Sequence, residues 1–142
     1  MFLEFVDQNI WWFVALAVVF NLLLWSIVQS SVPGANMVSA VEMPILQRKG
    51  KSIIIDVSSA KEFDQAHIAS SMNIPLESLD TEDVSLKKHK ESAIILVCQT
   101  GSRSLKAARK LVPAGYKNVN VIRGGLMSWN KENLPLESNS KV

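Results

Sequence analysis

An uninterrupted apolar run near the N-terminus limits what this chain can fold into more than any other feature. From Ile10 to Val28 the sequence reads IWWFVALAVVFNLLLWSIV, in which 17 of 19 residues are apolar and none is charged. As an α-helix this run would be about 28 Å long, close to the roughly 30 Å hydrocarbon core of a bilayer. Trp11, Trp12 and Trp25 lie near its ends, where indole rings rest among lipid headgroups. Residues 10–28 are therefore predicted to form a transmembrane helix surrounded by membrane lipid.

Two other interpretations of the run fit less well. A cleaved signal peptide needs a positively charged start, whereas this chain offers Glu4 and Asp7 there. A buried core helix would have to be enclosed by the rest of a short chain, which is difficult for a helix that is apolar on every side. The amide of Asn21 inside the run marks either a helix of a membrane protein partner or a polar residue that the bilayer tolerates.

The distribution of charge predicts the orientation in the membrane. All 15 basic residues lie beyond residue 36, and residues 37–142 carry 15 basic and 11 acidic groups, a formal net charge of +4. Positively charged segments stay on the cytoplasmic side. We therefore predict a single-pass protein of a bacterial inner membrane, with residues 1–9 outside and the C-terminal domain cytoplasmic.

The overall composition excludes several classes of function. A net charge of +2, without aromatic residues interleaved among basic ones, argues against a nucleic-acid partner. Cys98 is the one cysteine, which excludes an internal disulfide and a cysteine-rich zinc module. A reducing cytoplasm would keep this residue a thiol.

Beyond the apolar run, the pattern predicts a linker over 29–36, an α/β domain over 37–136 and a polar tail over 137–142. Short runs rich in β-branched residues, buried on both faces, are typical of a parallel sheet. We expect strands at 52–57, 72–74, 93–97 and 119–122. We expect helices at 104–112, after Gly125, and from a cap at Ser39 to Arg48, with Pro44 deep in that last helix.

The candidate chemistry follows the strand that ends at Val97. There a strand, a tight polar loop and a helix N-terminus are expected in succession, and ligands bind at such strand ends in α/β sheets. The helix dipole, the loop N–H groups and a nearby cation would all favour the thiolate form of the cysteine. We predict a catalytic Cys98 within an anion-binding loop made of Gln99, Thr100, Gly101, Ser102, Arg103 and Ser104.

These residues resemble the C-x-[ST]-G-x-R-S active loop of the rhodanese-homology family in its single-domain, membrane-anchored form. Upstream, the chain is similar to that family's D-V, E-F, H-I and N-I-P signatures, and downstream to its G-Y and G-G-x-x-x-W pattern. The residues that carry this likeness are Asp56-Val57, Glu62-Phe63, His67-Ile68, Asn73-Ile74-Pro75, Gly115-Tyr116, Gly124-Gly125 and Trp129.

The resemblance implies about five parallel strands flanked by helices and a sulfurtransferase that needs no metal or organic cofactor. It implies that Cys98 takes sulfane sulfur from a small donor such as thiosulfate and passes it, as a persulfide, to a thiol or cyanide acceptor. Ser58 stands where the family has an arginine that would pair with Glu62 or Asp64, and Gln99 stands where many active members have arginine. The second departure predicts weaker activity with dianionic thiosulfate.

Two other functions remain open at this point. The same fold could be an inactive docking module for membrane protein partners, or the loop could belong to a phosphatase or arsenate reductase. The latter class uses C-x5-R, whereas only four residues separate Cys98 from Arg103. We expect His67, Asp56 and Trp129 to have structural roles.

Overall fold

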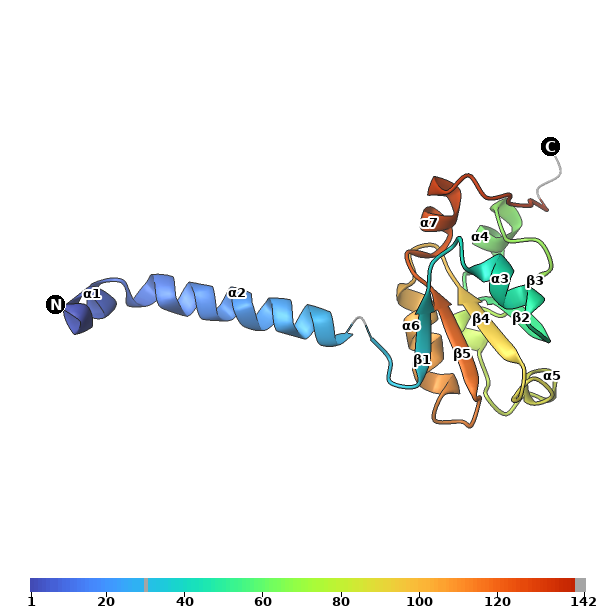
Figure 1. The fold of residues 1–142 in the computed structure, drawn as a ribbon, viewed down its shortest axis with the longest axis horizontal. Coiled ribbons are helices and arrows are strands. Elements are labelled where there is room, and N and C mark those ends of the chain that lie inside the picture. The colour runs from blue at the N-terminus through green and yellow to red at the C-terminus, as the bar shows by residue number, and fades with distance from the viewer. Residues whose placement is uncertain (30, 140–142) are drawn as a thin grey trace. The chain divides into compact units, whose positions relative to one another are not determined.

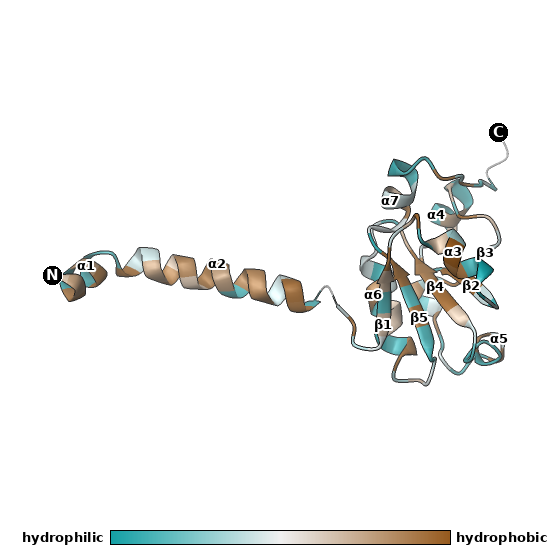
Figure 2. Ribbon diagram, viewed as in Figure 1, coloured by the Kyte–Doolittle hydropathy of each residue, from teal (hydrophilic) through white to brown (hydrophobic). Residues whose placement is uncertain are grey.

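The computed structural model describes residues 1–29 and 31–139, which form two compact units divided between residues 31 and 32. In the first unit, a short helix α1 (Phe2–Gln8) precedes the 20-residue helix α2 (Ile10–Gln29). No residue of α2 is buried, and most of its ribbon has the brown of hydrophobic residues in Figure 2. By length and composition, α2 is a candidate membrane span.

The second unit is built on a five-stranded parallel sheet (Figure 1). Its spatial order is β1-β5-β4-β2-β3, with every neighbouring pair parallel. The strands are β1 (Ala35–Val38), β2 (Ser52–Asp56), β3 (Ser71–Asn73), β4 (Ala93–Val97) and β5 (Asn118–Ile122). The predicted α/β class and parallel sheet are confirmed.

The central strand explains why the sheet holds together. From Ile94 to Val97 every side chain of β4 is fully buried, because helices cover both faces of the sheet. Alternate residues therefore enter two different cores. Ile94 and Leu96 pack with residues of α6 (Ser102–Leu111), whereas Ile95 and Val97 pack with residues of α3 (Met43–Arg48) and α7 (Gly125–Lys131).

Shorter helical segments complete the domain. They are α4 (Ala60–Gln65), the 3₁₀ turn η1 (Leu76–Ser78) and α5 (Val84–Lys87). The helix α4 begins with a capping box, in which the Ser59 side chain accepts from the Glu62 backbone N–H and the Glu62 carboxylate accepts from the Ser59 backbone N–H. This box fixes the Glu62 carboxylate in place at the start of α4.

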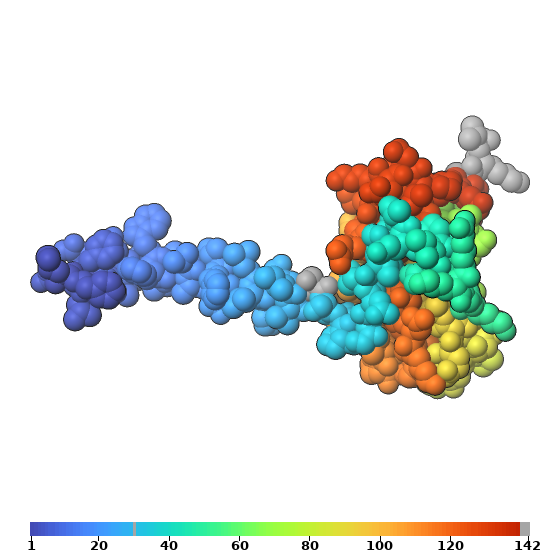
Figure 3. Space-filling model, in the orientation of Figure 1, coloured from blue at the N-terminus to red at the C-terminus, as the bar shows by residue number. Residues whose placement is uncertain are grey.

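The structure differs from the sequence prediction around residues 32–48. Val32 is buried in the core and β1 begins at Ala35, so residues that were expected in the linker belong to the domain. The helix expected from Ser39 begins only at Met43, which places Pro44 in the first helical turn, where its missing N–H costs nothing. The space-filling view in Figure 3 shows residues of the domain's first segment, in cyan, beside the orange and red residues from near its end, consistent with the pairing of β1 and β5.

The predicted tail is partly tied to the domain. The backbone groups of Glu137 and His67 exchange two hydrogen bonds of 2.8 and 2.9 Å, and the Asn139 N–H donates to the Asp64 carbonyl at 2.9 Å. Residues 140–142 of that tail lie outside the described residues.

Candidate active site

The loop between β4 and α6 carries Cys98 at its base. The side chain of Cys98 is fully buried, and its Sγ accepts a hydrogen bond from the Gly101 backbone N–H at 3.0 Å. Gly101 is the N-cap of α6 and has a φ of +95°, a left-handed conformation that disfavours any residue with a side chain. This turn brings the N–H back onto the sulfur, so a negative charge on Sγ has a donor already directed at it.

The other predicted loop residues take up different positions. Thr100 and Ser102 are exposed, with their hydroxyl oxygens 3.3 Å apart, and Gln99 is half-buried. Ser104 is fully buried inside the first turn of α6, and its Oγ has no hydrogen-bond partner in the part of the chain that the structure describes. The structure therefore places two hydroxyls at the outer surface of the loop and one beneath it.

Arg103 forms a two-pronged ion pair with Glu62. Its Nη1 and Nη2 donate to the two carboxylate oxygens of Glu62 at 2.7 and 2.8 Å. These bonds and those from Ser59 lower the pKa of Glu62 from 4.5 to about 2. Arg103 was predicted to steady an anion in the loop, whereas here its guanidinium is joined to a carboxylate that balances its charge.

Glu62 was not among the predicted site residues. Its local signal was present, because Ser59 and Glu62 form the S-x-x-E pattern of a capping box. The pairing with Arg103 has no signal in sequence spacing, since the two residues are 41 positions apart. Ser58 stands where the family has an arginine that would pair with Glu62 or Asp64. In this structure the Glu62 carboxylate pairs with Arg103 of the loop.

The turn between β5 and α7 supports the opposite side of the loop. The Leu126 N–H donates to the Cys98 carbonyl at 2.8 Å, and the Met127 N–H donates to the Gln99 carbonyl at 3.1 Å. This approach requires glycine, because a Cβ on Gly125 would lie 2.2 Å from the Cys98 carbonyl oxygen. The G-G pair therefore lets a backbone segment press directly against the active loop.

A hollow of about 380 Å³ lies beside the loop, lined by one loop residue together with residues of the β5–α7 turn and α7. These are Thr100, Gly124, Met127, Ser128 and Lys131. The Met127 side chain is 63% exposed, so the hollow offers apolar surface next to a lysine and two hydroxyls. Such a surface suits a small amphipathic molecule approaching the loop.

Asp56 is buried at the end of β2, in register with Val97 of β4. Its Oδ1 accepts from the Ser58 backbone N–H at 2.9 Å, while Oδ2 has no partner among the described residues. Burial raises the pKa of this carboxyl, although hydrogen bonds from Ser58 act in the opposite direction. Through its bond to the Ser58 N–H, the Asp56 side chain holds the backbone that follows β2.

His67 and Trp129 make contacts of a structural kind. His67 stacks on Phe63 with ring centroids 4.0 Å apart, and its Nδ1 donates to the Phe63 carbonyl at 2.8 Å. Trp129 is buried in the core and its Nε1 donates to the Pro135 carbonyl at 2.9 Å. Within residues 1–29 and 31–139, no cluster of three His, Cys, Asp or Glu side chains could hold a metal ion.

Comparison with known protein families agrees with this geometry. Residues 39–132 match the family described as "Rhodanese-like domain", which accounts for more than half of the chain. The chain belongs to the rhodanese-like family. The loop that begins at Cys98 and leads into α6 lies within the matched residues.

Individual relatives of this rhodanese-like protein include characterised and uncharacterised members. The uncharacterised protein YibN of Escherichia coli is 30% identical over 102 residues, covering 71% of each chain. Thiosulfate sulfurtransferase 16 of Arabidopsis thaliana is 33% identical over 94 residues, covering 59% of this chain and 78% of that protein. A Bacillus halodurans crystal structure has a TM-score of 0.63 and 29% identity, covering 73% of this chain and 77% of that one. The relatives therefore include sulfurtransferases.

Proposed function

We propose that this protein is a membrane-tethered sulfurtransferase that carries sulfane sulfur as a persulfide on Cys98. The observation that carries the proposal is the Gly101 N–H aimed at Cys98 Sγ from 3.0 Å, within a loop that leads into the N-terminus of α6. A donor in this position stabilises a thiolate before reaction and a persulfide anion after it.

The reaction has two displacement steps. In the first, the Cys98 thiolate attacks the sulfane sulfur of the donor, an S–S bond to Sγ forms, and the donor's own S–S bond breaks. With thiosulfate, sulfite leaves with the electron pair of that bond. In the second, an acceptor thiolate or cyanide attacks the outer sulfur of the persulfide, and Cys98 is released as a thiolate.

The charges around the loop favour a donor with less negative charge than thiosulfate. Arg103 is paired with Glu62, and position 99 is glutamine, so the loop holds no uncompensated cation of its own. A dianion consequently depends on backbone N–H groups and the helix dipole for its stabilisation. We expect persulfides of small thiols to be better donors than thiosulfate.

Intact mass spectrometry of the purified protein tests the proposal. After incubation with a sulfane donor, the native protein should gain one sulfur atom, and a thiol or cyanide should remove it. Cys98→Ser should gain none. A native protein that is folded and never takes up sulfur from thiosulfate, polysulfide or a thiol persulfide would contradict the proposal and favour a docking module.

Phosphate-ester hydrolysis is the second activity to test. The phosphatase pattern C-x5-R has five residues between its cysteine and its arginine, whereas this chain has four. The loop is therefore narrower than one that binds a tetrahedral phosphate. In addition, both outer nitrogens of Arg103 are already engaged by Glu62. We expect no turnover of an aryl phosphate by a preparation that forms the persulfide.

The tether places the reaction at a membrane surface. This part of the proposal is supported by the length and apolar composition of α2 and by the basic residues, all of which follow it in the sequence. We propose a bacterial inner membrane with the domain in the cytoplasm. A cysteine introduced at Ser31 in a Cys98→Ser background should resist a membrane-impermeant thiol reagent in intact cells and react after lysis. Labelling in intact cells would reverse the proposed orientation.

A further inference from the structure

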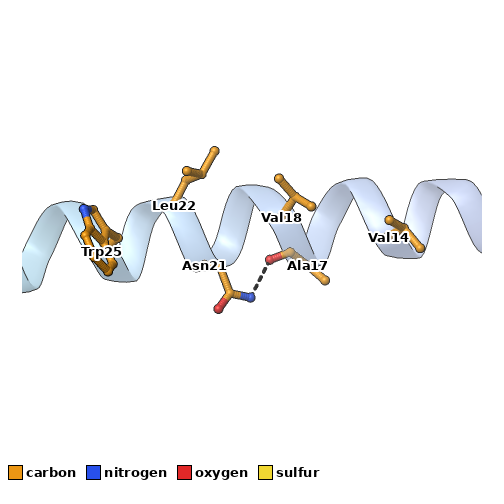
Figure 4. Close-up of a pocket in the computed structure, with 6 residues that line it drawn as sticks. All are labelled: Val14, Ala17, Val18, Asn21, Leu22 and Trp25. Atoms are coloured by element: carbon orange, nitrogen blue, oxygen red, sulfur yellow. Dashed lines mark hydrogen bonds between the residues drawn. The ribbon is translucent and has the colours of Figure 1, made fainter.

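Helix α2 carries a polar side chain near the middle of its apolar length. The Asn21 Nδ2 donates to the Ala17 carbonyl at 2.8 Å, as the dashed line in Figure 4 shows. That bond uses one of its two amide hydrogens. Within the described residues, the second hydrogen and the carbonyl oxygen Oδ1 have no hydrogen-bond partner. In hydrocarbon these groups remain unsatisfied, because lipid tails neither donate nor accept.

Asn21 lies on a continuous stripe of α2. The members of this stripe follow one another at intervals of three, one, three, one and three positions, which keeps them on one side of an α-helix. We call it the Asn21 face, and it consists of Val14, Ala17, Val18, Asn21, Leu22 and Trp25. These six residues line a shallow groove of about 480 Å³, with the small side chain of Ala17 one turn before the amide. A neighbouring helix can therefore come close to Asn21.

We infer that the Asn21 face binds the same face of a second copy of this chain, with the two Asn21 amides hydrogen-bonded to each other. The inference rests on the proposed membrane anchoring of α2. Along this face, Val14, Val18, Asn21 and Trp25 follow one another at intervals of four, three and four residues. This is the spacing by which transmembrane helices pack side by side at a small crossing angle.

The chemistry of the amide favours a second copy over another occupant. A carboxamide offers both a donor and an acceptor, so two identical amides related by a twofold axis satisfy each other. Copies of a single-pass protein also insert in the same direction, which puts their Asn21 residues at the same depth. Residues 10–29 contain no charged side chain, so two such helices do not repel each other.

Disulfide crosslinking of the full-length protein in lipid vesicles tests the inference. In a Cys98→Ser background, Val18→Cys places a thiol on the Asn21 face, and Leu23→Cys places one on the opposite side of α2. We expect Val18→Cys to form dimers several times faster than Leu23→Cys under mild oxidation. Adding Asn21→Leu to Val18→Cys should lower the dimer fraction about three- to tenfold, the effect of one interhelical amide bond.

Two further variants separate the amide from general packing. Asn21→Gln keeps a carboxamide and should retain most of the dimer, whereas Leu23→Ala on the opposite side should leave the dimer fraction unchanged. Equal crosslinking at positions 18 and 23, or an unchanged dimer in Asn21→Leu, overturns the inference. Crosslinking of Val18→Cys in native membranes to a different protein, and not to itself, also overturns it.

Extraction of the membranes with alkaline carbonate separates this result from the proposed tether. Protein that leaves the membrane contradicts the tether and with it the dimer. Protein that stays in the membrane but is monomeric contradicts the dimer alone, and the sulfur-transfer assay on Cys98 is independent of both outcomes.

Discussion

The loop that carries Cys98 is supported on its two sides by different kinds of interaction. On the α4 side, a charged pair of Arg103 and Glu62 joins the loop to a helix cap. On the α7 side, backbone groups of Leu126 and Met127 bond to the loop, and Gly125 brings the two segments together. The ion pair of Arg103 and Glu62 can be weakened gradually, by protonating the carboxylate or by shortening either side chain. The α7 side depends on the close approach of two backbone segments, so a single carbon added at Gly125 disrupts it.

The largest effect is expected from Gly125→Ala. The added Cβ would lie 2.2 Å from the Cys98 carbonyl oxygen, and the residue has a φ of +59°. Because the atoms that this Cβ would meet belong to the backbone of Cys98 and Gln99, they cannot move away without distorting the loop. We expect the free energy of unfolding to fall by at least about 3 kcal/mol and persulfide formation to be lost.

Two other glycines provide matched controls for that experiment. Gly115 also has a positive φ of +93°, but a Cβ there would meet only the Lys90 Nζ at 4.0 Å. Gly115→Ala should therefore cost about 1 kcal/mol, measured by urea unfolding. Gly50→Ala meets nothing within 4 Å and should leave stability unchanged. Equal losses in Gly125→Ala and Gly115→Ala would show that the close approach does not matter.

The next largest effect is expected from the charged side. Arg103→Ala removes the link between the loop and α4, while Glu62 keeps its hydrogen bonds from Ser59. Sulfur transfer should fall at least about tenfold with the domain still folded. Arg103→Lys, which keeps the charge but loses the two-pronged geometry, should give an intermediate rate. Lys106→Ala, an exposed change on the same helix, is the control, and a normal rate in Arg103→Ala would show that the α7 side suffices.

The charged side should also respond to pH, whereas the α7 side should not. The pKa of Glu62 is lowered to about 2 from 4.5, so the folded state favours the ionised carboxylate. This contribution to stability is present above pH 4.5 and is lost as the pH falls toward 2. Unfolding by urea across that range should show a stability difference between the native protein and Glu62→Gln that shrinks with acid. A constant difference would contradict the pairing.

The smallest effect is expected at Asp56, which is buried at the end of β2. Burial raises the pKa of this carboxyl above 3.8, so the folded state favours protonated Asp56. The contribution of this group to the free energy of unfolding is complete below pH 3.8 and declines as the pH rises through the raised pKa. Asp56→Asn keeps an oxygen for the Ser58 N–H and carries no charge. Its melting temperature at neutral pH should equal or exceed that of the native protein, and a large decrease would show that the fold needs the charge.

The sheet was predictable because its central strands are apolar runs that only a two-sided core can bury. β2 and β4 are such runs, and the structure places them next to each other. β1 was missed because its sequence, Ala-Asn-Met-Val, looks like the polar linker before it. Its place at the edge of the sheet depends on β5, through backbone pairing and the Asn36–Asn120 hydrogen bond, and these contacts join residues 84 positions apart.

In the candidate site too, contiguous segments could be predicted from the sequence, whereas contacts between distant residues could not. The loop from Cys98 to Ser104 was readable as one continuous segment, and so was the glycine pair at 124 and 125. The partners that hold the loop were not, because Glu62 and Leu126 reach it only through the folding of the sheet. Arg103 was consequently interpreted as a ligand-binding cation, whereas the structure shows it in an ion pair.

The Glu62 carboxylate has a consequence for the way this domain fluctuates. One oxygen accepts from the Ser59 N–H, the Ser59 hydroxyl and Arg103, so the first turn of α4 and the active loop share an acceptor. Transient opening of either segment removes a hydrogen bond from the other, so we expect the two to open together. If the proposed persulfide on Cys98 stabilises the loop, amide hydrogen exchange at the start of α4 should slow as well, and that helix would report on the state of Cys98 from a distance.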